Sequence, residues 1–236
     1  MEKKFDEIMS LDPYNYLGKK VDIKTILNWF DLCDAAWIHD GDSKKPHAEL
    51  TSGKCSNAYF NCPEVLKFGP LNEILAYQLY QNLREAGATK VDWVIGSPYA
   101  AITFSYELAK LFKAIHGFTE KDPKDSEGKK MVWRRMVIPS GSSVLQVEEL
   151  VSTSGTFQEV RRAVEKGNAE PVNFLPEIGV LIHRPPKLPV DYGDRRIVAL
   201  VEKEVWAVES DECPLYKTGS PRCRPKSHWR ELTGKV

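Results

Sequence analysis

Short apolar runs alternate with segments of helical spacing along this chain. The runs at 91–95, 132–138, 144–147 and 178–182 are rich in valine and isoleucine, which is typical of buried strands. Segments with apolar side chains every three or four positions lie between them, as at 102–112. This alternation predicts an α/β fold in which helices flank a mostly parallel central sheet.

Two helices with recognisable ends are expected before the first of these strands. Asp22 is a good N-cap for one helix, whose apolar stripe runs from Ile23 to Trp37. Pro70 suits the first turn of the next helix, and Gly87 is placed to end it. The core face of that second helix is expected to consist of Leu71, Ile74, Leu75, Leu79 and Leu83.

The remaining segments set the expected domain limits. Residues 1–20 are predicted to be a loosely attached lead-in, residues 21–210 one domain, and residues 211–236 a C-terminal tail. A short hairpin is expected within 47–62. The stretch at 120–130 is charged, contains Pro and Gly and has no apolar period, so an exposed mobile loop is predicted there.

The segment at 144–156 carries the strongest indication of chemistry. Its strand leads into two carboxylates and a turn of small hydroxyl residues, and then into a helix that Gly167 is placed to end. A helix N-terminus suits a phosphate, and carboxylates just before it suit sugar hydroxyls on the same ligand. An ordinary surface turn is the alternative, and neither a Walker loop nor GxGxxG is present. The candidate residues are Glu148, Glu149, Leu150, Val151, Ser152, Thr153, Ser154, Gly155 and Thr156.

This segment resembles the phosphoribosyl-pyrophosphate loop of the type I phosphoribosyltransferases. Residues 47–66 resemble the N-terminal segment of the orotate phosphoribosyltransferases. Residues 118–121, together with Arg134 and Arg135, resemble one bacterial and archaeal branch of that family, and residues 212–220 are similar to its Glu-Cys-Pro-Leu-Cys ending. The resemblance implies the type I phosphoribosyltransferase fold, with a small hood built from N- and C-terminal segments.

The resemblance also implies an activity. It is the transfer of the phosphoribosyl group of 5-phospho-α-D-ribose 1-diphosphate to orotate, giving orotidine 5′-monophosphate and diphosphate in pyrimidine nucleotide biosynthesis. Mg²⁺ would be held mostly by substrate oxygens and water, without dedicated protein ligands. A homodimer is implied, because the mobile loop of the family reaches into the neighbouring subunit's site.

Individual roles follow from the same resemblance. Glu148 and Glu149 would bind the ribose hydroxyls and offset developing positive charge, and residues 152–156 would hold the 5′-phosphate. Lys121 would contact diphosphate, and Arg184 would contact orotate, assisted by Ser152. Further substrate-binding residues are expected at Ser52, Gly53, Lys54, Gly96, Ser97, Tyr99, Ala100 and Ala101.

Simpler explanations and two other functions stay open. Lys121 could be one of several solvated lysines, and Arg184 could end a strand. Trp93, Tyr99 and Phe104 are better explained by core packing than by base stacking. The chain could also use another base, or it could be a sensor that binds phosphoribosyl pyrophosphate without catalysis. The sensor is suggested by departures from the family pattern at Ala100, Ala101, Glu149 and Ser154.

Composition limits the remaining possibilities. Lys and Arg total 33 and Asp and Glu total 33, so no overall charge would attract nucleic acid or an acidic membrane. Without a membrane span or signal-peptide core, a soluble cytoplasmic protein is expected. The five cysteines show no disulfide rhythm. Cys213, Cys223 and His228 could form part of a metal site, but structural zinc requires four close ligands, so no metal-binding residue is predicted.

Overall fold

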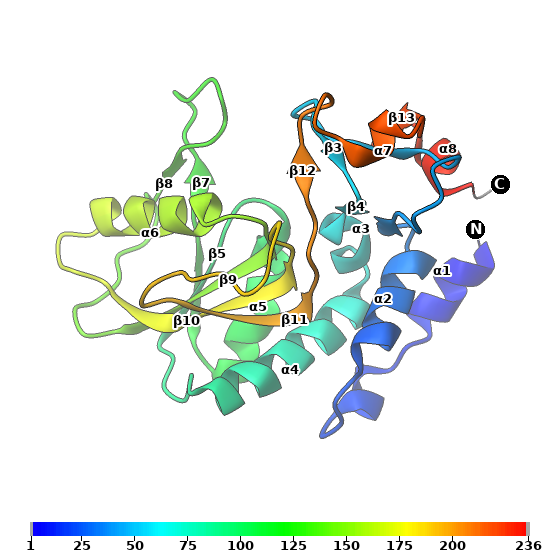
Figure 1. Ribbon diagram of the computed structural model, residues 1–236. Helices are drawn as coiled ribbons and strands as arrows, with labels where there is room; N and C mark the ends of the chain where they lie inside the picture. Colours follow the sequence, from blue (N-terminus) through cyan, green and yellow to red (C-terminus); the bar gives the residue numbers. More distant parts are fainter. Residues whose placement is uncertain (1, 235–236) are drawn as a thin grey trace.

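A computed structural model describes residues 2–234 of the chain, and its centre is a five-stranded parallel sheet (Figure 1). The strands follow the order β11-β10-β9-β5-β6, and every neighbouring pair is parallel. Their bounds are β5 Trp93–Gly96, β6 Ile115–Phe118, β9 Ser143–Val151, β10 Asn173–His183 and β11 Arg196–Glu202. The predicted α/β class and parallel sheet are confirmed.

Helices cover both faces of this sheet, as Figure 1 shows. Helices α4 (Gly69–Ala86) and α5 (Ala100–Phe112) pack on one face, and α6 (Gly155–Gly167) packs on the other. The alternation of side chains along β5 explains how both faces are filled, because Val94 belongs to the α4 and α5 core while Trp93 and Ile95 belong to the α6 core.

The smaller second part of the molecule is a four-stranded sheet in the order β12-β3-β2-β13. The hairpin of β2 (His47–Glu49) and β3 (Cys55–Ser56) lies in its centre. Strands β12 (Ala207–Val208) and β13 (Arg222–Cys223) come from the C-terminal part and pair with the two sides of this hairpin. We call this four-stranded sheet and the C-terminal segment 207–234 the hood.

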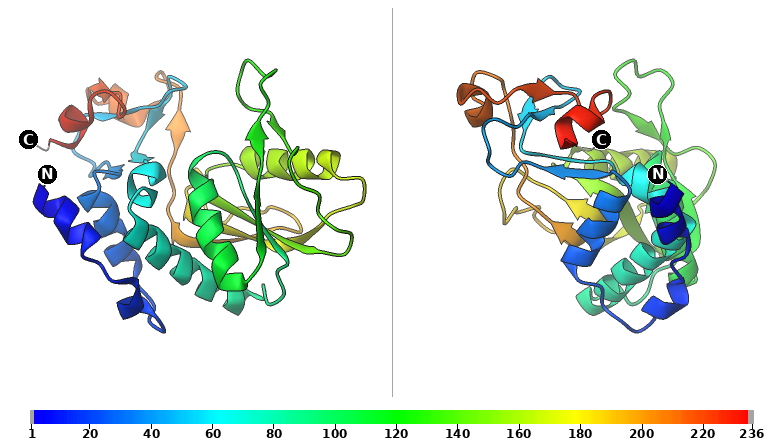
Figure 2. Two further views of the ribbon diagram at one scale, coloured as in Figure 1. Left: turned by 180° about the vertical axis from the view of Figure 1, so that it is seen from behind. Right: turned by 90° about the vertical axis from the view of Figure 1, so that its right-hand side faces the viewer.

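The remaining elements are short or lie near the N-terminus. The first helix, α1, and the last, α8, line one hollow together, and Figure 2 shows them close together in both of its views. The bounds are α1 Glu2–Met9, η1 Pro13–Tyr16, α2 Ile23–Leu32, β1 Ala36–Ile38, β4 Ala58–Phe60, α3 Cys62–Leu66, β7 Glu120–Lys121, β8 Met131–Val132, α7 Pro214–Lys217 and α8 Trp229–Thr233.

The predicted start of α2 and the predicted end of α4 agree with the structure. Asp22 caps α2, and its carboxylate accepts a hydrogen bond from the Thr25 backbone N–H. Gly87 ends α4 with φ +114°, a left-handed conformation that glycine adopts without steric cost. The lead-in is attached through Ile8, which is 1% exposed in the main core. The division of the chain at residues 20 and 210 stays a prediction.

Several predicted elements were wrong or displaced. Trp37 belongs to β1 and not to the α2 stripe, because the helix ends at Leu32. Only Val132 of the predicted strand 132–138 is in a strand, since Trp133 and Ile138 pack into the α6 core instead. The edge strands β6 and β11 were missed. Helix α5 begins at Ala100, two positions before the predicted start of the segment 102–112. Strand β9 extends beyond the predicted 144–147, through both glutamates, to Val151.

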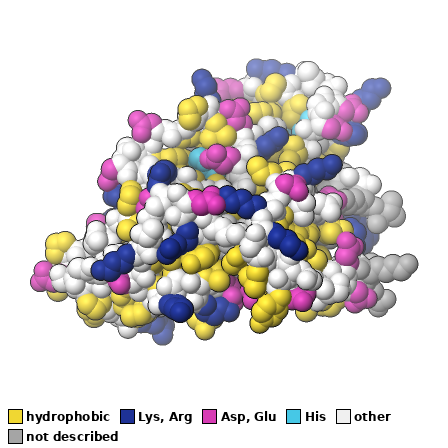
Figure 3. Space-filling view, turned by 90° about the horizontal axis from the view of Figure 1, so that it is seen from below, with side chains coloured by type: hydrophobic (Ala, Val, Ile, Leu, Met, Phe, Trp, Pro, Cys, Tyr) yellow, Lys and Arg dark blue, Asp and Glu magenta, His cyan; other side chains and the backbone are white. Residues whose placement is uncertain are grey.

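The surface agrees with the balanced composition. Seen from below in Figure 3, basic and acidic side chains are interspersed with hydrophobic ones, without a large patch of one sign on this face. Within residues 2–234 no helix combines the length and the apolar character that crossing a lipid bilayer requires.

Gly167 offers a test of the packing between α6 and the segment after β8. A β-carbon added there would lie 2.6 Å from the Trp133 carbonyl oxygen and 2.8 Å from its Cβ. We expect Gly167→Ala to lower the free energy of unfolding by about 1–3 kcal/mol, because the backbone at Trp133 or at the end of α6 must move to make room for the methyl group. Gly69→Ala is the control, since open space surrounds Gly69. Equal urea midpoints for both variants would contradict this packing.

Candidate active site

The two glutamates lie at the carboxyl end of β9, but their surroundings differ. Glu148 is fully buried, and its carboxyl group is hydrogen-bonded to the Ser97 hydroxyl and, at 2.8 Å, to the Gln146 side-chain amide. Glu149 is half-buried, and its backbone oxygen lies 3.4 Å from the Cys62 Sγ. The Glu148 carboxyl group therefore lies in the protein interior, whereas Glu149 lies at a partly exposed position next to Cys62 of α3.

Burial controls the charge of these carboxyl groups. The pKa of Glu148 is raised to about 8, mainly by loss of solvation and in part by the nearby Glu149 charge, while the hydrogen bonds from Ser97 and Gln146 and the Lys121 charge oppose the shift. Loss of solvation also raises the pKa of Glu149, again opposed by Lys121. Lys121, on β7, is thus near enough to both glutamates to act on their charges, and its predicted contact with diphosphate stays a prediction.

The predicted phosphate loop lies where expected, at the start of α6. Ser152 to Ser154 form a turn after β9, and Ser154 is the N-cap of α6 without a capping side-chain hydrogen bond. The Thr153, Gly155 and Thr156 positions are exposed. Unpaired N–H groups at this helix start remain available to an anion. Leu150 and Val151 instead pack their side chains into the core, so only their backbone could contact a ligand.

The substrate-binding residues predicted within 96–101, at the position of the family's pyrophosphate loop, follow β5, and Ser97 contacts Glu148. Gly96 lets α5 approach, because a β-carbon there would lie 2.8 Å from the Ala101 carbonyl oxygen. Ala100 and Ala101 are in α5 with ordinary negative φ, and Ala101 is fully buried. Tyr99 was wrongly assigned to the core: it is 74% exposed, because it precedes the helix at the open end of the strand. Trp93 and Phe104 are core residues as predicted.

Arg184 follows β10 and lies beside the end of β9. Its backbone N–H donates to the Val151 carbonyl at 2.7 Å. Its Nε is buried and has no hydrogen-bond partner within the described chain. Burial lowers the pKa of the guanidinium, while the nearby Cys62 and Tyr59 oppose that shift. The structure thus places a half-buried cation near Tyr59 on β4 and Cys62 on α3, two neighbours that the sequence did not single out.

The hairpin residues are not joined to this cluster. Ser52 and Gly53 are exposed in the turn of the hood hairpin, and Lys54 makes a 3.2 Å ion pair with Glu209. In the part of the chain that the structure describes, no hydrogen bond or ion pair links these three residues to Glu148, Glu149 or Arg184. Their substrate-binding role stays a prediction.

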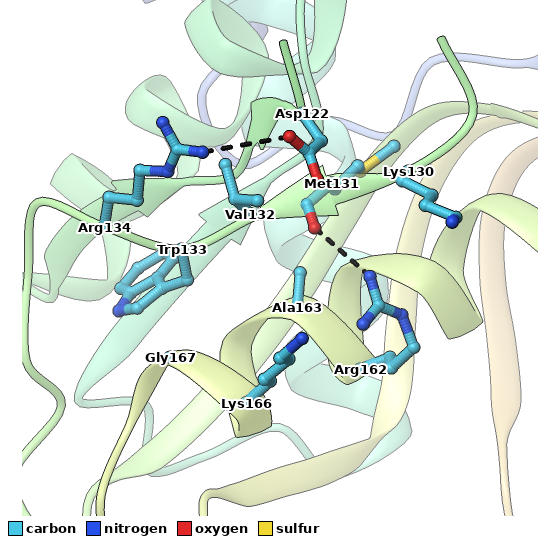
Figure 4. Close-up of a pocket in the computed structure, with 10 residues that line it drawn as sticks. All are labelled: Asp122, Lys130, Met131, Val132, Trp133, Arg134, Arg162, Ala163, Lys166 and Gly167. Atoms are coloured by element: carbon cyan, nitrogen blue, oxygen red, sulfur yellow. Dashed lines mark hydrogen bonds and ion pairs between the residues drawn. The ribbon is translucent and has the colours of Figure 1, made fainter. Parts of the chain in front are cut away.

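A hollow of about 560 Å³ lies beside the 120–130 segment, and Figure 4 shows its lining. Arg134 pairs with Asp122 at 3.8 Å, and Arg162 donates to the Met131 carbonyl at 3.2 Å. Lys166 and Gly167, also in its wall, belong to the C-terminal end of α6. This hollow therefore lies away from the helix N-terminus where the phosphate is predicted.

Comparison with known proteins agrees with this geometry, although no protein-family model matches the chain. The orotate phosphoribosyltransferase of Desulforamulus reducens is 33% identical over 187 residues, which cover 79% of this chain and 90% of that relative. The enzyme of that name from Pelotomaculum thermopropionicum is 33% identical over 181 residues, covering 77% and 88%. The one from Caldicellulosiruptor bescii is 30% identical over 181 residues, with the same coverage.

Solved structures show the same architecture. Orotate phosphoribosyltransferase from Francisella tularensis superposes with a TM-score of 0.50 at 15% identity, covering 76% of this chain and 85% of that one. UMP synthase of Leishmania donovani superposes with a TM-score of 0.50 at 17% identity, covering 75% of this chain and 36% of that longer chain. The fold is that of the type I phosphoribosyltransferases, which are glycosyltransferases. Within that class, the chain belongs to the orotate phosphoribosyltransferase family.

The raised pKa of Glu148 predicts a pH-dependent stability. An unfolded Glu148 loses its proton near the ordinary 4.5, whereas the folded one holds it to about pH 8. Between these values the folded state binds the extra proton, so its stability falls as pH rises. Glu148→Gln is neutral throughout and should become the more stable protein toward pH 8, by about 1.4 kcal/mol per pKa unit of the shift.

Urea denaturation at pH 5, 6.5 and 8 measures this effect. Glu170→Gln removes an exposed carboxyl after α6 and should follow the parent at every pH. A constant difference between Glu148→Gln and the parent from pH 5 to 8 would show that the carboxyl is already ionised in the folded protein.

Proposed function

We propose that the chain catalyses transfer of the phosphoribosyl group from 5-phospho-α-D-ribose 1-diphosphate to orotate. The products are orotidine 5′-monophosphate and diphosphate. Support comes from relatives that carry this enzyme name and that the chain matches over 88–90% of their length. In the reaction, a ring nitrogen of orotate gives up its proton, which the released diphosphate takes up, and forms a bond to the anomeric carbon. The bond from that carbon to the diphosphate oxygen breaks, and diphosphate leaves with the electron pair.

The single observation that carries the proposal is the desolvated guanidinium of Arg184. The side chain is half-buried, and its buried Nε–H has no hydrogen-bond partner among residues 2–234, which is costly unless an anion completes it. Orotate carries a carboxylate on a planar ring, and guanidinium binds carboxylates through two parallel hydrogen bonds. Cys62 is near both Arg184 and Glu149, so a base bound to Arg184 would lie on the same side of the site as a ribose bound at Glu149.

The remaining residues divide the work of positioning and charge stabilisation. The turn at 152–156 and the start of α6 would hold the 5′-phosphate through backbone N–H groups and hydroxyls. Glu149 would accept hydrogen bonds from ribose hydroxyls and offset positive charge at the anomeric carbon. Glu148 would support it from inside, with its orientation fixed by Ser97 and Gln146. Lys121 would neutralise the departing diphosphate.

The donor atoms at this edge of the sheet also fit Mg²⁺. Carboxylate and hydroxyl oxygens are the ligands this ion prefers, and it keeps several waters or substrate oxygens. Glu149 and the hydroxyls of 152–156 would be the protein groups nearest to it. When bound with diphosphate, Mg²⁺ would reduce the negative charge that the leaving group develops.

Two further properties belong to the same proposal. A homodimer would let Lys121, on its short two-stranded β7–β8 element, complete the site of a second copy. A cytoplasmic location is supported by the five cysteines, all of which are buried and free of disulfide bonds. The departures at Ala100 and Ala101 need not abolish activity, because both residues hold ordinary backbone conformations.

Formation of orotidine monophosphate by the purified chain with Mg²⁺ tests the activity. We expect Lys121→Ala to lower kcat at least tenfold while the affinity for orotidine monophosphate stays near that of the parent, since Lys121 would act on diphosphate. Lys124→Ala is the control, because Lys124 is exposed in the same segment. Binding of phosphoribosyl pyrophosphate without product from orotate, uracil or a purine would instead support a sensor.

Titration calorimetry with orotate tests the assignment of Arg184. Arg184→Ala should weaken orotate binding by about 2–5 kcal/mol, because one partner of a desolvated charge pair is removed. Binding of phosphoribosyl pyrophosphate should change little. Arg184→Lys should recover only part of the loss, since lysine lacks the two-pronged geometry. Arg195→Ala is the matched control, and a larger loss there would transfer the role to Arg195.

A further inference from the structure

Three metal-binding side chains meet inside the hood, apart from the candidate active site. His47 lies on β2, Cys55 on β3, and Cys213 directly before α7, and all three are fully buried. One ligand atom from each, an imidazole nitrogen and two sulfurs, lies within 4.8 Å of the other two. Sequence spacing gave no indication of this cluster, because His47 and Cys213 are 166 positions apart.

Neighbouring hydrogen bonds decide which nitrogen of His47 carries its proton. The Ser220 hydroxyl donates its only hydrogen to the Lys45 carbonyl at 2.6 Å. It must therefore accept the hydrogen bond that joins it to His47 Nδ1 at 2.8 Å, so Nδ1 is protonated. The lone pair of Nε2 is left facing Cys213 Sγ at 3.6 Å. A second partner that fixes the tautomer and ring orientation is the usual support of a metal-binding histidine.

The sulfur atoms have a matching environment. The Tyr216 backbone N–H donates to Cys213 Sγ at 3.3 Å. The side chains of Cys55 and Cys213 are in hydrogen-bond contact with each other. A bound cation would supply the positive charge that two buried thiolates need.

We propose that His47 Nε2, Cys55 Sγ and Cys213 Sγ bind one zinc-type divalent ion. Each thiol loses its proton to solvent as the metal–sulfur bond forms, and a water occupies the fourth tetrahedral position. Two sulfurs and one imidazole suit zinc and exclude Mg²⁺ as the preferred ion, since Mg²⁺ takes oxygen ligands. This ion is therefore separate from the one associated with diphosphate.

The position of the cluster gives the ion a structural role. Cys55 and His47 belong to the two strands of the hairpin, whereas Cys213 belongs to the segment that connects β12 with β13. A metal bound to all three side chains would link the C-terminal segment directly to both strands of the hairpin. Its removal should loosen the hood and leave the parallel sheet folded.

Metal analysis of the purified full chain tests this proposal. We expect about one zinc per chain after preparation with a phosphine reductant and no added metal, measured by mass spectrometry of the elements. Cobalt added to the metal-free protein should give a thiolate-to-cobalt charge-transfer band. Both signals should be lost in Cys55→Ser and in Cys213→Ser. Cys223→Ser is the matched control, since Cys223 is buried in the same segment but hydrogen-bonds the His228 carbonyl, and it should keep both.

Two measurements keep the test valid if a serine variant fails to fold. Zinc should raise the melting temperature of the metal-free parent, and a strong chelator should reverse that rise. Tyr216→Cys should bind zinc at least tenfold more tightly, because residue 216 lies at Cys-x-x-Cys spacing from Cys213.

Three outcomes would overturn the proposal. The first is a parent protein with neither bound metal, nor a cobalt band, nor a zinc-dependent melting temperature. The second is unchanged zinc content in folded Cys55→Ser. The third is a Cys55–Cys213 disulfide in freshly isolated protein, which would assign the pair to redox chemistry.

Discussion

The carboxyl group of Glu148 connects the main parts of the candidate site. It joins β9 to the loop after β5 through Ser97, and to α6 through Gln146, whose side chain also bonds the Phe157 carbonyl. Gln146 accepts in turn from Arg161 at 3.2 Å, and burial lowers the pKa of this arginine to about 10. A buried polar chain is tolerated only when its members are hydrogen-bonded, so the positions of these three elements are mutually constrained.

This constraint explains the unequal roles of two adjacent glutamates. Residues in a strand alternate between the faces, and Glu148 and Glu149 therefore point to opposite sides of β9. One side is filled by the Ser97 and Gln146 contacts, and the other faces Cys62. A shift of β9 by one residue would exchange these environments and leave a charge in the core. The register of β9 is thus a requirement of the site as well as of the sheet.

The sequence predicted correctly those elements that neighbouring residues determine. It failed for elements that depend on contacts with residues far away in the sequence. Asp22, Gly87 and the glycine-containing turn before α6 act within a few residues, so their positions could be read directly. The segment 132–138 has the apolar content of a strand, but Trp133 packs on the α6 side. Edge strands such as β6 are partly exposed, with Ile115 55% exposed, and therefore lack a continuous apolar run.

Prediction of the candidate site was limited in the same way, because residues that only folding brings together were missed. The glutamates, the turn at 152–156 and Arg184 were predicted as site residues because contiguous motifs resemble a known family, and their roles stay predictions. Tyr59 and Cys62 were missed as neighbours of Arg184, because only folding brings them near residues more than a hundred positions away. The His47, Cys55 and Cys213 cluster depends in the same way on strand pairing between distant segments.

The strand order of the hood has a consequence for synthesis on the ribosome. The hairpin strands β2 and β3 are made early, yet their outer partners β13 and β12 are among the last segments of the described chain to emerge. The five-stranded sheet ends at Glu202 and can form before either partner is available. During that interval both sides of the hairpin present unpaired N–H and C=O groups, which can pair with other nascent chains. The speed at which residues 203–234 are released therefore sets how long each new molecule remains prone to aggregation.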